Sequence, residues 1–474
     1  MANEIRPDYD SMHLFPPVLE DWVPADHPAR FIRDFVDALD LEDLEFKARR
    51  SERGRPNYAL DLLLKVWLYG YFNRIRSTRD LERACHEHLS LIWLTGMKYP
   101  DHNTLWRFLR NNPEAIRKAF AAGVRVAASS DLVGMVLHAL DGTKIRAQAS
   151  RHTAHHREQL ERALKDLDSK IDKRLSEVEA TEREQEGDYK LPEELQDAEI
   201  RRQVIRDALA ELDAAETNHL QPAEPDARMM KCDGQVDFGY NSQAVVDERS
   251  GLILAADVTT EETDYEQLVP MVKKVDEVLG DTAEETVADR GYSSGPALHE
   301  AQEEGLDVLV HLQPHMDEPE HPDEFHCSRF QHDTQTDVII CPHGKTLTFE
   351  QEKWDCSNKY KVRVYRCQSF RDCPDRDRCS PSKRGRTVRI NPYKSAVEKQ
   401  IEKQQTPEAK RSLSRRKVIV EPPFGTIKEG MSFRRFTIRN LDGVRMQWAL
   451  VCFAFNLRKL YRSWSEGVFV LPAC

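Results

Sequence analysis

Three acidic residues stand where their carboxylates could meet in a folded chain. Asp141 follows the apolar run 136–140, and Asp289 follows a second short apolar run, two residues before Gly291. An aspartate at the end of a strand points out of the sheet into a cleft, where its oxygens can bind a divalent cation such as Mg²⁺ or Mn²⁺. Glu421 lies far downstream, in the segment KVIVEPPFGTIKEG. Alone, each aspartate has an ordinary alternative as a turn or helix-cap residue.

A cation follows the third carboxylate. Lys428 stands seven residues after Glu421, which is about two turns of an α-helix, so both side chains can face the same side. A lysine ammonium is a compact point charge that suits a phosphate group. We expect Lys428 to contact a phosphate near the carboxylates.

Four cysteines form a second group of chemically distinctive residues, in the segment 313–400. Cys341 opens the sequence CPHG, and Cys367, Cys373 and Cys379 follow it. Four thiolates suit a tetrahedral structural Zn²⁺, although the spacing between the last three is looser than in a C-x₂-C pair. The alternative is a set of free buried thiols. Other candidate ligands in the same segment are Cys356, His326, His332 and His343.

Charge is distributed unevenly along the chain. The whole sequence has a formal net charge of −12, which as an average argues against a partner as acidic as DNA. Residues 359–462, however, contain 27 Lys and Arg against 9 Asp and Glu, a balance of +18 that leaves −30 for the remainder. Aromatic residues are interleaved with these cations, as in a surface that follows phosphates and stacks bases. The alternative is a solvated basic face that pairs with the acidic part of the chain.

Composition indicates a folded protein with several structural units. The chain has 474 residues, 40% of them hydrophobic and 32% charged, which predicts about two to four units. The start MANEIRPDYD lacks the basic and apolar regions of a signal peptide, and ten cysteines in so long a chain do not suggest a small disulfide scaffold. The longest apolar stretch, Trp448 to Leu457, is about half the length that spans a bilayer. We expect a cytoplasmic protein without a membrane segment.

The first part of the chain, residues 1–130, is predicted to be helical, because its apolar residues recur at spacings of three and four. Its end, PDHNTLWRFLRNNP, sets a helix start after Pro100 and places Trp106, Arg107 and Arg110 on the helix that follows. This arrangement is typical of a helix-turn-helix that reads DNA. The alternative is a capped amphipathic helix without a DNA contact.

From Gly134 the pattern changes to short β-type runs with a helix predicted over 296–304. Strands alternating with helices indicate an α/β layer, which we assign to residues 131–312 as the first part of a core. The candidate strands are 136–140, 236–246, 252–258, 286–288 and 308–312.

Two insertions interrupt this core. Residues 155–230 carry two runs of helical spacing separated by the break EGDYKLP, which predicts a helical hairpin with an acidic surface. The cysteine-rich segment, 313–400, has little helical periodicity. Helical pattern returns over 394–404 and again from Arg415, and residues 401–474 form the C-terminal part of the core.

Several segments together resemble a known family. LDGTKIRAQAS, VADRGYSS and VEPPFGTIKE, in this order, resemble the three catalytic segments of bacterial insertion-sequence transposases of the DDE superfamily, which have an RNase H-like core. The N-terminal part, from HLFPPVLEDWVPADHPARFIRDFVDALDL through PDHNTLWRFL, resembles the helical N-terminal domain of these proteins. Related transposases often carry a cysteine-rich segment, with an extra Cys where this chain has Phe370. Four matched blocks in order cover almost the whole chain.

The resemblance implies a fold and a set of site residues. It implies an RNase H-like mixed sheet flanked by helices, with an all-helical N-terminal DNA-binding domain. The catalytic acidic residues of the family fall on Asp141, Asp289 and Glu421, and its lysine falls on Lys428. Asp264, in TTEETDYEQLVP, matches a segment in which a polar residue precedes a helix. We interpret Asp264 as an N-cap or as a residue behind the metal ligands, with direct metal contact as the alternative.

The chain departs from the family pattern just before Glu421. The family often has a Tyr and an Arg seven and four residues before the Glu, where this chain has Ser414 and Lys417. The cation is therefore kept, but the aromatic phosphate contact is lost. Arg415 and Arg416 are candidate substitutes for that DNA contact.

The function implied by the resemblance is that of a DNA transposase. Such an enzyme binds the terminal inverted repeats of its element and uses two divalent cations to cleave DNA strands and join them to target DNA. Asp141 is expected to bridge both cations, with Asp289 and Glu421 each holding one. Because two DNA ends must be held together, we expect a homodimer in the synaptic complex. The alternatives are an RNase H-like nuclease or resolvase without strand transfer, and a catalytically silent DNA-binding protein derived from a transposase.

Overall fold

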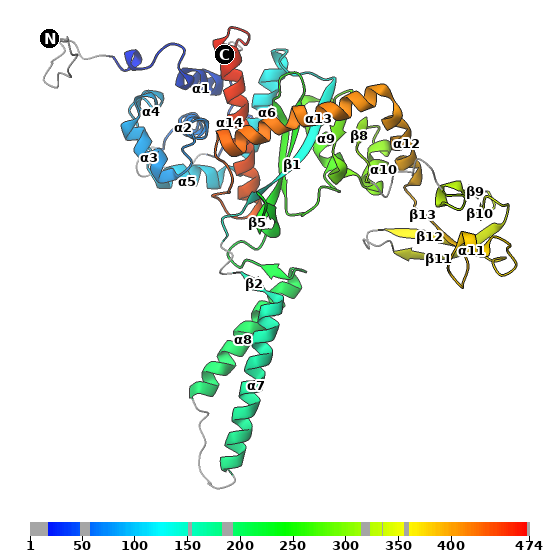
Figure 1. Ribbon diagram of the computed structural model, residues 1–474. Helices are drawn as coiled ribbons and strands as arrows, with labels where there is room; N and C mark the ends of the chain where they lie inside the picture. Colours follow the sequence, from blue (N-terminus) through cyan, green and yellow to red (C-terminus); the bar gives the residue numbers. More distant parts are fainter. Residues whose placement is uncertain are drawn as a thin grey trace, which may run out of the picture.

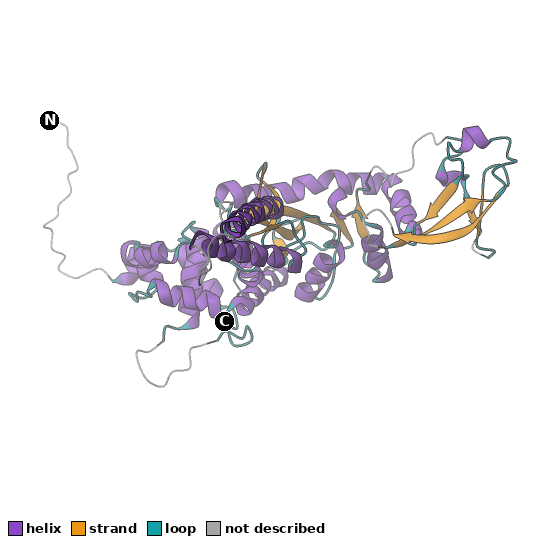
Figure 2. Ribbon diagram, turned by 90° about the horizontal axis from the view of Figure 1, so that it is seen from below, coloured by secondary structure: helices purple, strands orange, loops and turns teal. Residues whose placement is uncertain are grey.

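The computed structural model describes residues 18–47, 57–149, 154–182, 193–313, 323–333, 335–354 and 360–471. These residues form a helical N-terminal region, a central sheet flanked by helices, and two projections (Figure 1). One projection is a pair of long helices, and the other is a small sheet in the cysteine-rich segment (Figures 1 and 2). The candidate ligand Cys356 lies outside the described residues.

The N-terminal region is helical, as the spacing of its apolar residues predicted. Local signals define the helix ends: the Asp101 carboxylate accepts a hydrogen bond from the Thr104 amide at 2.7 Å, and Pro113 begins the next helix, where its missing N–H has no intrahelical role. The buried faces of these helices join the central core, in which Trp67 and Trp448 are fully buried. The elements are η1 (Leu19–Trp22), α1 (Pro28–Asp37), α2 (Leu60–Phe72), α3 (Thr78–Glu87), α4 (Leu89–Leu94), α5 (His102–Asn111) and α6 (Pro113–Ser129).

The central sheet is mixed. β1 pairs in parallel with β7, and β7 in parallel with β8, whereas β5 pairs antiparallel with β1, β4 and β6. Two parallel strands thus lie on one side of β1 and antiparallel strands on the other, which confirms the predicted RNase H-like mixed sheet. The strands are β1 (Leu137–Arg146), β4 (Arg228–Cys232), β5 (Gln235–Asp247), β6 (Ile253–Thr259), β7 (Glu285–Ala288) and β8 (Val308–Val310).

Long helices cover the sheet and fix its position relative to the N-terminal region. α14 packs against α2, α6 and β6, and the Trp448 indole N–H donates to the Gln243 carbonyl oxygen at 2.9 Å. The Gln447 side-chain amide donates to the Tyr71 hydroxyl at 2.8 Å, so a buried polar contact also joins α14 to α2. α13 crosses β1, β5, β7 and β8 (Figure 1). The helices of this part are α9 (Leu268–Leu279), α10 (Gly295–Glu303), α12 (Lys394–Gln405), α13 (Pro407–Gly425) and α14 (Leu441–Ser465).

The predicted helical hairpin projects from the core between β1 and β5 (Figure 1). It consists of α7 (Arg157–Glu182) and α8 (Glu193–Ala214), which pack against each other. At its base, β2 (His155–His156) pairs antiparallel with β3 (His219–Leu220). The entering and leaving chains are therefore hydrogen-bonded neighbours.

The cysteine-rich segment folds as a five-stranded antiparallel sheet with a small core of its own. Phe330, Leu347 and Tyr365 are buried in this core and do not belong to the main one. The elements are η4 (Cys327–Arg329), β9 (Gln331–Asp333), β10 (Val338–Ile340), β11 (Thr346–Trp354), β12 (Lys361–Cys367), α11 (Arg376–Cys379) and β13 (Thr387–Ile390).

The helix predicted from Lys394 begins at that residue, but the next C-terminal helix begins earlier than the sequence pattern indicated. α13 starts at Pro407, capped by the Thr406 hydroxyl, eight residues before the predicted start at Arg415. The basic, weakly periodic stretch in between hid the helix, because its exposed side chains carry no apolar repeat. Beyond Gly425 the chain continues as one π-helical turn, η5 (Thr426–Gly430). Within the described ranges, every helix is too short or too polar to cross a bilayer.

Candidate active site

The sheet register brings Asp141 and Asp289 together. β1 and β7 are parallel, and their pairing ends with Ala139 opposite Val287, so the two aspartates stand at the same height two residues later. β1 continues beyond this point beside β5, with Asp141 opposite Ala244, while β7 ends at Ala288. Asp289 thus follows the end of β7, and both aspartates are half-buried.

A tight turn fixes the Asp289 side chain. Its carboxylate caps the short helix η3 (Arg290–Tyr292) and accepts a hydrogen bond from the Gly291 amide at 2.7 Å. A Cβ atom at Gly291 would lie 2.9 Å from Oδ1 of Asp289 and 3.1 Å from Oδ2 of Asp264. Glycine is therefore required here because two carboxylates approach its α-carbon.

Burial and a cation act on Asp141 in opposite directions. Burial raises the pKa of Asp141 to about 6, the positive charge of Arg416 lowers it, and the nearby Asp289 raises it again. Nη1 of Arg416 lies 2.9 Å from Oδ2 of Asp141. Two acidic groups held this close attract a positive charge, and in this conformation Arg416 supplies it.

Asp264 approaches the two aspartates from another part of the chain. Its Oδ1 accepts hydrogen bonds from the Asn241 amide at 2.6 Å and the Gln243 amide at 2.7 Å, and Lys144 Nζ lies 3.4 Å from its carboxylate. The residue that caps α9 is Gln267, so the N-cap interpretation of Asp264 is wrong. The contacts instead place Asp264 behind Gly291, beside the two aspartates.

Sequence reasoning missed the polar residues that hold Asp264. Asn241 and Gln243 are fully buried on β5, in the segment YNSQAVV. Two large amides inside an otherwise apolar buried strand are a signal in themselves, because a buried amide must find hydrogen-bond partners. Tyr292 completes the network by donating its hydroxyl to Oε1 of Gln243, and burial raises its pKa well above the ordinary value, so the phenol stays protonated.

Glu421 is exposed and does not join the two aspartates. It lies on α13 five residues after Arg416, which is about 140° around the helix, so the two side chains point in different directions. Arg416 faces the sheet and Glu421 faces away from the helix's buried side. Within the described part of the chain, no three acidic, His or Cys side chains are grouped closely enough to hold a metal ion.

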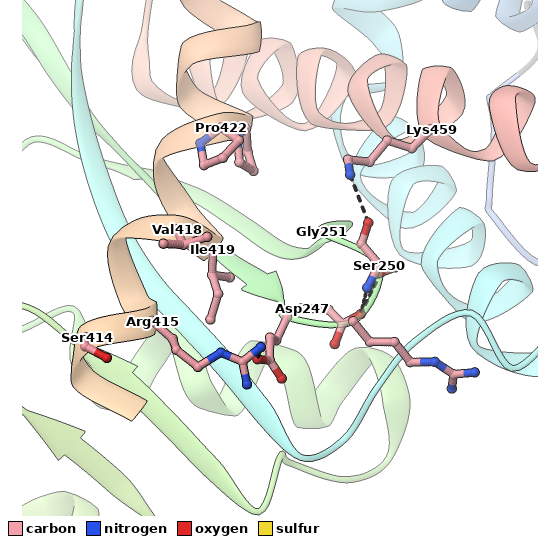
Figure 3. Close-up of a pocket in the computed structure, with 12 residues that line it drawn as sticks. Asp247, Ser250, Gly251, Ser414, Arg415, Val418, Ile419, Pro422 and Lys459 are labelled. Carbon is pink, nitrogen blue, oxygen red and sulfur yellow. Dashed lines mark hydrogen bonds and ion pairs between the residues drawn. The ribbon is translucent and has the colours of Figure 1, made fainter. Parts of the chain in front are cut away.

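Contacts on another side of α13 hold the helix in this rotation. Arg415 forms an ion pair with Glu248, and a cavity of about 500 Å³ separates α13 from the turn after β5 and from α14 (Figure 3). Figure 3 shows Val418 and Pro422 on the helix side, and Lys459 reaching across to the Ser250 carbonyl oxygen, with an Nζ–O distance of 2.9 Å. The direction in which Glu421 points therefore depends on how α13 packs beside this cavity.

The candidate DNA contacts lie in different environments. Arg416 is buried against Asp141, so this structure does not offer it to a DNA backbone, unlike the sequence-based expectation. The reason is helix phase, because the residue falls at the centre of the face that packs on the sheet. Lys417 is exposed, and Lys428 pairs with Asp233 at 3.0 Å. Arg107 and Arg110 are exposed on α5.

The four predicted cysteine ligands line one small cavity in the cysteine-rich segment. Burial raises the pKa of the Cys379 thiol, with further increases from Cys341, Cys373 and Cys367. The Lys345 amide donates to Sγ of Cys341 at 3.2 Å. Cys341, Cys367, Cys373 and Cys379 thus line one cavity together with His343, although within the described residues they are not grouped closely enough to hold a metal ion in this conformation.

Family comparisons match two parts of the chain. Residues 17–111 match a family described as "Transposase domain (DUF772)", and residues 340–461 match one described as "Transposase DDE domain". The second match contains Glu421 and Lys428, and both matches leave out Asp141 and Asp289.

Among solved structures, the chain is similar to a chain of the "piggyBac transposase synaptic complex with hairpin DNA", with a TM-score of 0.34 and 10% identity over 94% of this chain and 77% of that one. A comparison with curated proteins finds no significant match. The two matches, to a transposase domain near the N-terminus and to a transposase DDE domain that contains Glu421, agree with the resemblance of these two parts of the chain to transposases.

Proposed function

We propose that the protein is a DNA transposase that binds the terminal inverted repeats of an insertion sequence and catalyses metal-dependent strand cleavage and strand transfer. The observation that carries this proposal is the position of Asp141, within β1, beside Asp289, just after the end of the parallel strand β7, in a chain that also matches a transposase DDE domain. The basic residues 359–462, which surround Glu421, supply the positive charge that a DNA substrate requires.

The acidic residues fit a divalent cation. Asp141 and Asp289 offer hard oxygen ligands, and the pKa of Asp141 is raised by its burial and, to a smaller extent, by the nearby Asp289. Glu421 is exposed in this structure. It would join Asp141 and Asp289 as a third ligand after a rotation or shift of α13. When bound, Mg²⁺ or Mn²⁺ would activate the attacking hydroxyl and stabilise the charge on the phosphate.

Other residues of the chain would position the substrate. Lys428 would contact a phosphate near the cleaved end, which requires that it leave Asp233. Lys417 and Arg415 would contact the DNA backbone beside it, and Arg107 and Arg110 would contact the repeat through α5. The four cysteines would bind a structural Zn²⁺ in the cysteine-rich segment. Two copies of the chain would hold the two DNA ends in a synaptic dimer.

The decisive experiment is incubation of the purified protein with DNA that carries the neighbouring inverted repeats, with and without Mg²⁺, scored for both cleavage and joining. Asp141→Ala, Asp289→Ala and Glu421→Ala should each abolish cleavage while keeping the thermal unfolding cooperative. Asp166→Ala, an exposed acidic residue on α7, is the matched control. Cleavage without joining would indicate a nuclease, and binding without either reaction would indicate a silent DNA-binding protein.

A further inference from the structure

A cavity that neither Asp141 nor Asp289 lines lies between the N-terminal region and the core. It has a volume of about 490 Å³ and is bounded by α5, by the chain just after β1 and by the start of α14. Its lining includes Trp106, Arg110, Gln148, Arg439, Asn440 and Met446.

Trp106 presents an aromatic surface to this cavity. α5 buries Leu105, Phe108 and Leu109 in the core, and this leaves Trp106 on the outer face with 40% of its surface exposed. By contrast, Trp67 and Trp448 are fully buried, and each donates its indole N–H to a carbonyl oxygen. Trp106 therefore offers an aromatic surface at the cavity wall on which a planar group can stack.

Arg110 and Arg439 line the same cavity as Trp106 and have no ion-pair partners among the described residues. Within the described chain, neither Arg110 nor Arg439 forms a hydrogen bond or an ion pair. Arg117 on the neighbouring helix differs, because it pairs with Glu114 and, at 3.2 Å, with Asp442. The lining of the cavity thus contains two arginines without ion-pair partners and one acidic residue, Asp442, which shares Arg117 with Glu114, so the net charge of the lining is positive.

The backbone at the start of α14 is already occupied. The Gly443 amide donates to the Asn440 side chain at 2.7 Å, and the Leu441 amide donates to Asp226 at 2.9 Å. An anion in the cavity must therefore be held by the two arginines. Guanidinium groups suit a phosphate because their planar N–H groups match its oxygens.

We propose that this cavity binds one unstacked nucleotide of the DNA substrate, with its base on Trp106 and its phosphate between Arg110 and Arg439. Aromatic stacking combined with nearby guanidinium groups is how proteins hold single-stranded nucleic acid without reading its sequence. The proposal rests on the proposed transposase function for the identity of the strand as DNA.

The position of the cavity along β1 gives a distance from the carboxylates. Gln148 stands seven residues after Asp141 on the same strand and its extension, a span of at most about 25 Å. Nucleotides of one strand are spaced by about 3.4 Å along a duplex. A strand that runs along β1 would therefore place a nucleotide about seven positions from the reacting phosphate in the cavity.

The test uses a fluorescently labelled single strand of ten thymidines, titrated with the full-length protein and followed by anisotropy. Trp106→Ala should weaken binding about tenfold, as expected from the loss of one stacked base. Trp106→Phe should keep most of the affinity, since a phenyl ring still stacks. The Arg110→Ala/Arg439→Ala double variant should weaken binding by a similar factor and reduce its dependence on salt.

Matched controls come from the same helical region. Leu89→Ala removes an exposed apolar side chain and Arg83→Ala an exposed cation, and both lie outside the cavity. Equal affinity of wild type and Trp106→Ala, or an equal loss in the two controls, would overturn the proposal. If Trp106→Ala fails to fold, Trp106→Phe and the arginine double variant decide the question. This test is separate from the test of the transposase function. If the wild-type protein cleaves inverted-repeat DNA but these variants bind the single strand as wild type does, the cavity proposal is rejected and the transposase proposal stands.

Discussion

Arg416 and Asp141 are 275 positions apart in the sequence, and Nη1 of the arginine lies 2.9 Å from Oδ2 of the aspartate. The contact joins α13 to the middle of β1. The Arg416 guanidinium therefore occupies a position beside Asp141 where the proposed reaction requires a divalent cation. The helix that carries Glu421 is thereby held by the carboxylate that Glu421 would have to approach.

Removing this cation should shift the pH dependence of the reaction. In Arg416→Gln the pKa of Asp141 is expected to rise above about 6, because the positive charge that favours its ionised form is lost. Cation binding needs the ionised carboxylate, so half-maximal cleavage of inverted-repeat DNA should move to higher pH. The measurement is a pH–rate profile, with Lys410→Gln on the exposed side of α13 as the control. Superimposable profiles for Arg416→Gln and wild type would show that the ion pair does not tune Asp141.

The raised pKa of Asp141 also predicts a pH-dependent stability difference. The folded pKa of about 6 lies above the ordinary value of 3.8, so the folded state binds this proton more tightly than the unfolded state does. The stabilising contribution is complete below pH 4 and is lost as the pH rises through 6. Between pH 4 and pH 7, wild type should lose about 2 kcal/mol relative to Asp141→Asn, which lacks the titrating group.

Urea unfolding of both proteins at pH 4, 5, 6 and 7 measures this difference. Asp166→Asn, on the exposed face of α7, should follow wild type at each pH. A constant gap between wild type and Asp141→Asn across the series would mean that Asp141 has an ordinary pKa in the folded protein.

A single methyl group at Gly291 should disturb the carboxylates without unfolding the protein. Gly291→Ala places a Cβ atom 2.9 Å from Oδ1 of Asp289 and 3.1 Å from Oδ2 of Asp264, so at least one carboxylate must move. We expect a loss of metal-dependent cleavage of at least about tenfold, because small displacements of catalytic groups are costly. Gly425→Ala is the control, since a Cβ there meets no atom within 4 Å. Full activity of Gly291→Ala would show that the position of Asp289 is not critical.

The cysteine-rich segment should contain zinc. Metal analysis of the purified protein is expected to find about one Zn²⁺ per chain, because four thiols line one cavity. Cys379→Ser should lower the zinc content and the unfolding temperature, whereas Cys327→Ser, an exposed cysteine outside the cavity, should change neither. Wild-type protein that is free of zinc and unaffected by a chelator would indicate buried thiols instead.

Much of the fold could be predicted from the sequence because its signals are local. The apolar runs that end at Asp141 and Asp289 define two strands, and the spacing of apolar residues defines the helical regions. The position of the two aspartates relative to each other could not be predicted from the neighbouring residues in the sequence. It depends on the parallel register of β1 with β7, which is set by packing of the whole sheet.

The environment of the third acidic residue could not be predicted in the same way. Whether Glu421 or Arg416 faces the sheet depends on the phase of α13, and that phase is set by contacts with the sheet and with the turn after β5. The heptad-like spacing of Glu421 and Lys428 assumed a continuous α-helix, but the helix changes to a π-helical turn after Gly425. The orientation of Glu421 relative to the two aspartates is therefore determined by contacts between segments that are distant in the sequence, and the motif alone does not specify it.

The base of the helical hairpin has one more consequence. The chain leaves and re-enters the core as adjacent strands, with His155 opposite Leu220 and His156 opposite His219. The distance between the two ends is thus set at the neck and does not depend on how far the helices extend. Removal of equal numbers of turns from α7 and α8 would leave the strand that bears Asp141 connected to β5 by the same span, so the length of this arm can vary independently of the chemistry at the sheet.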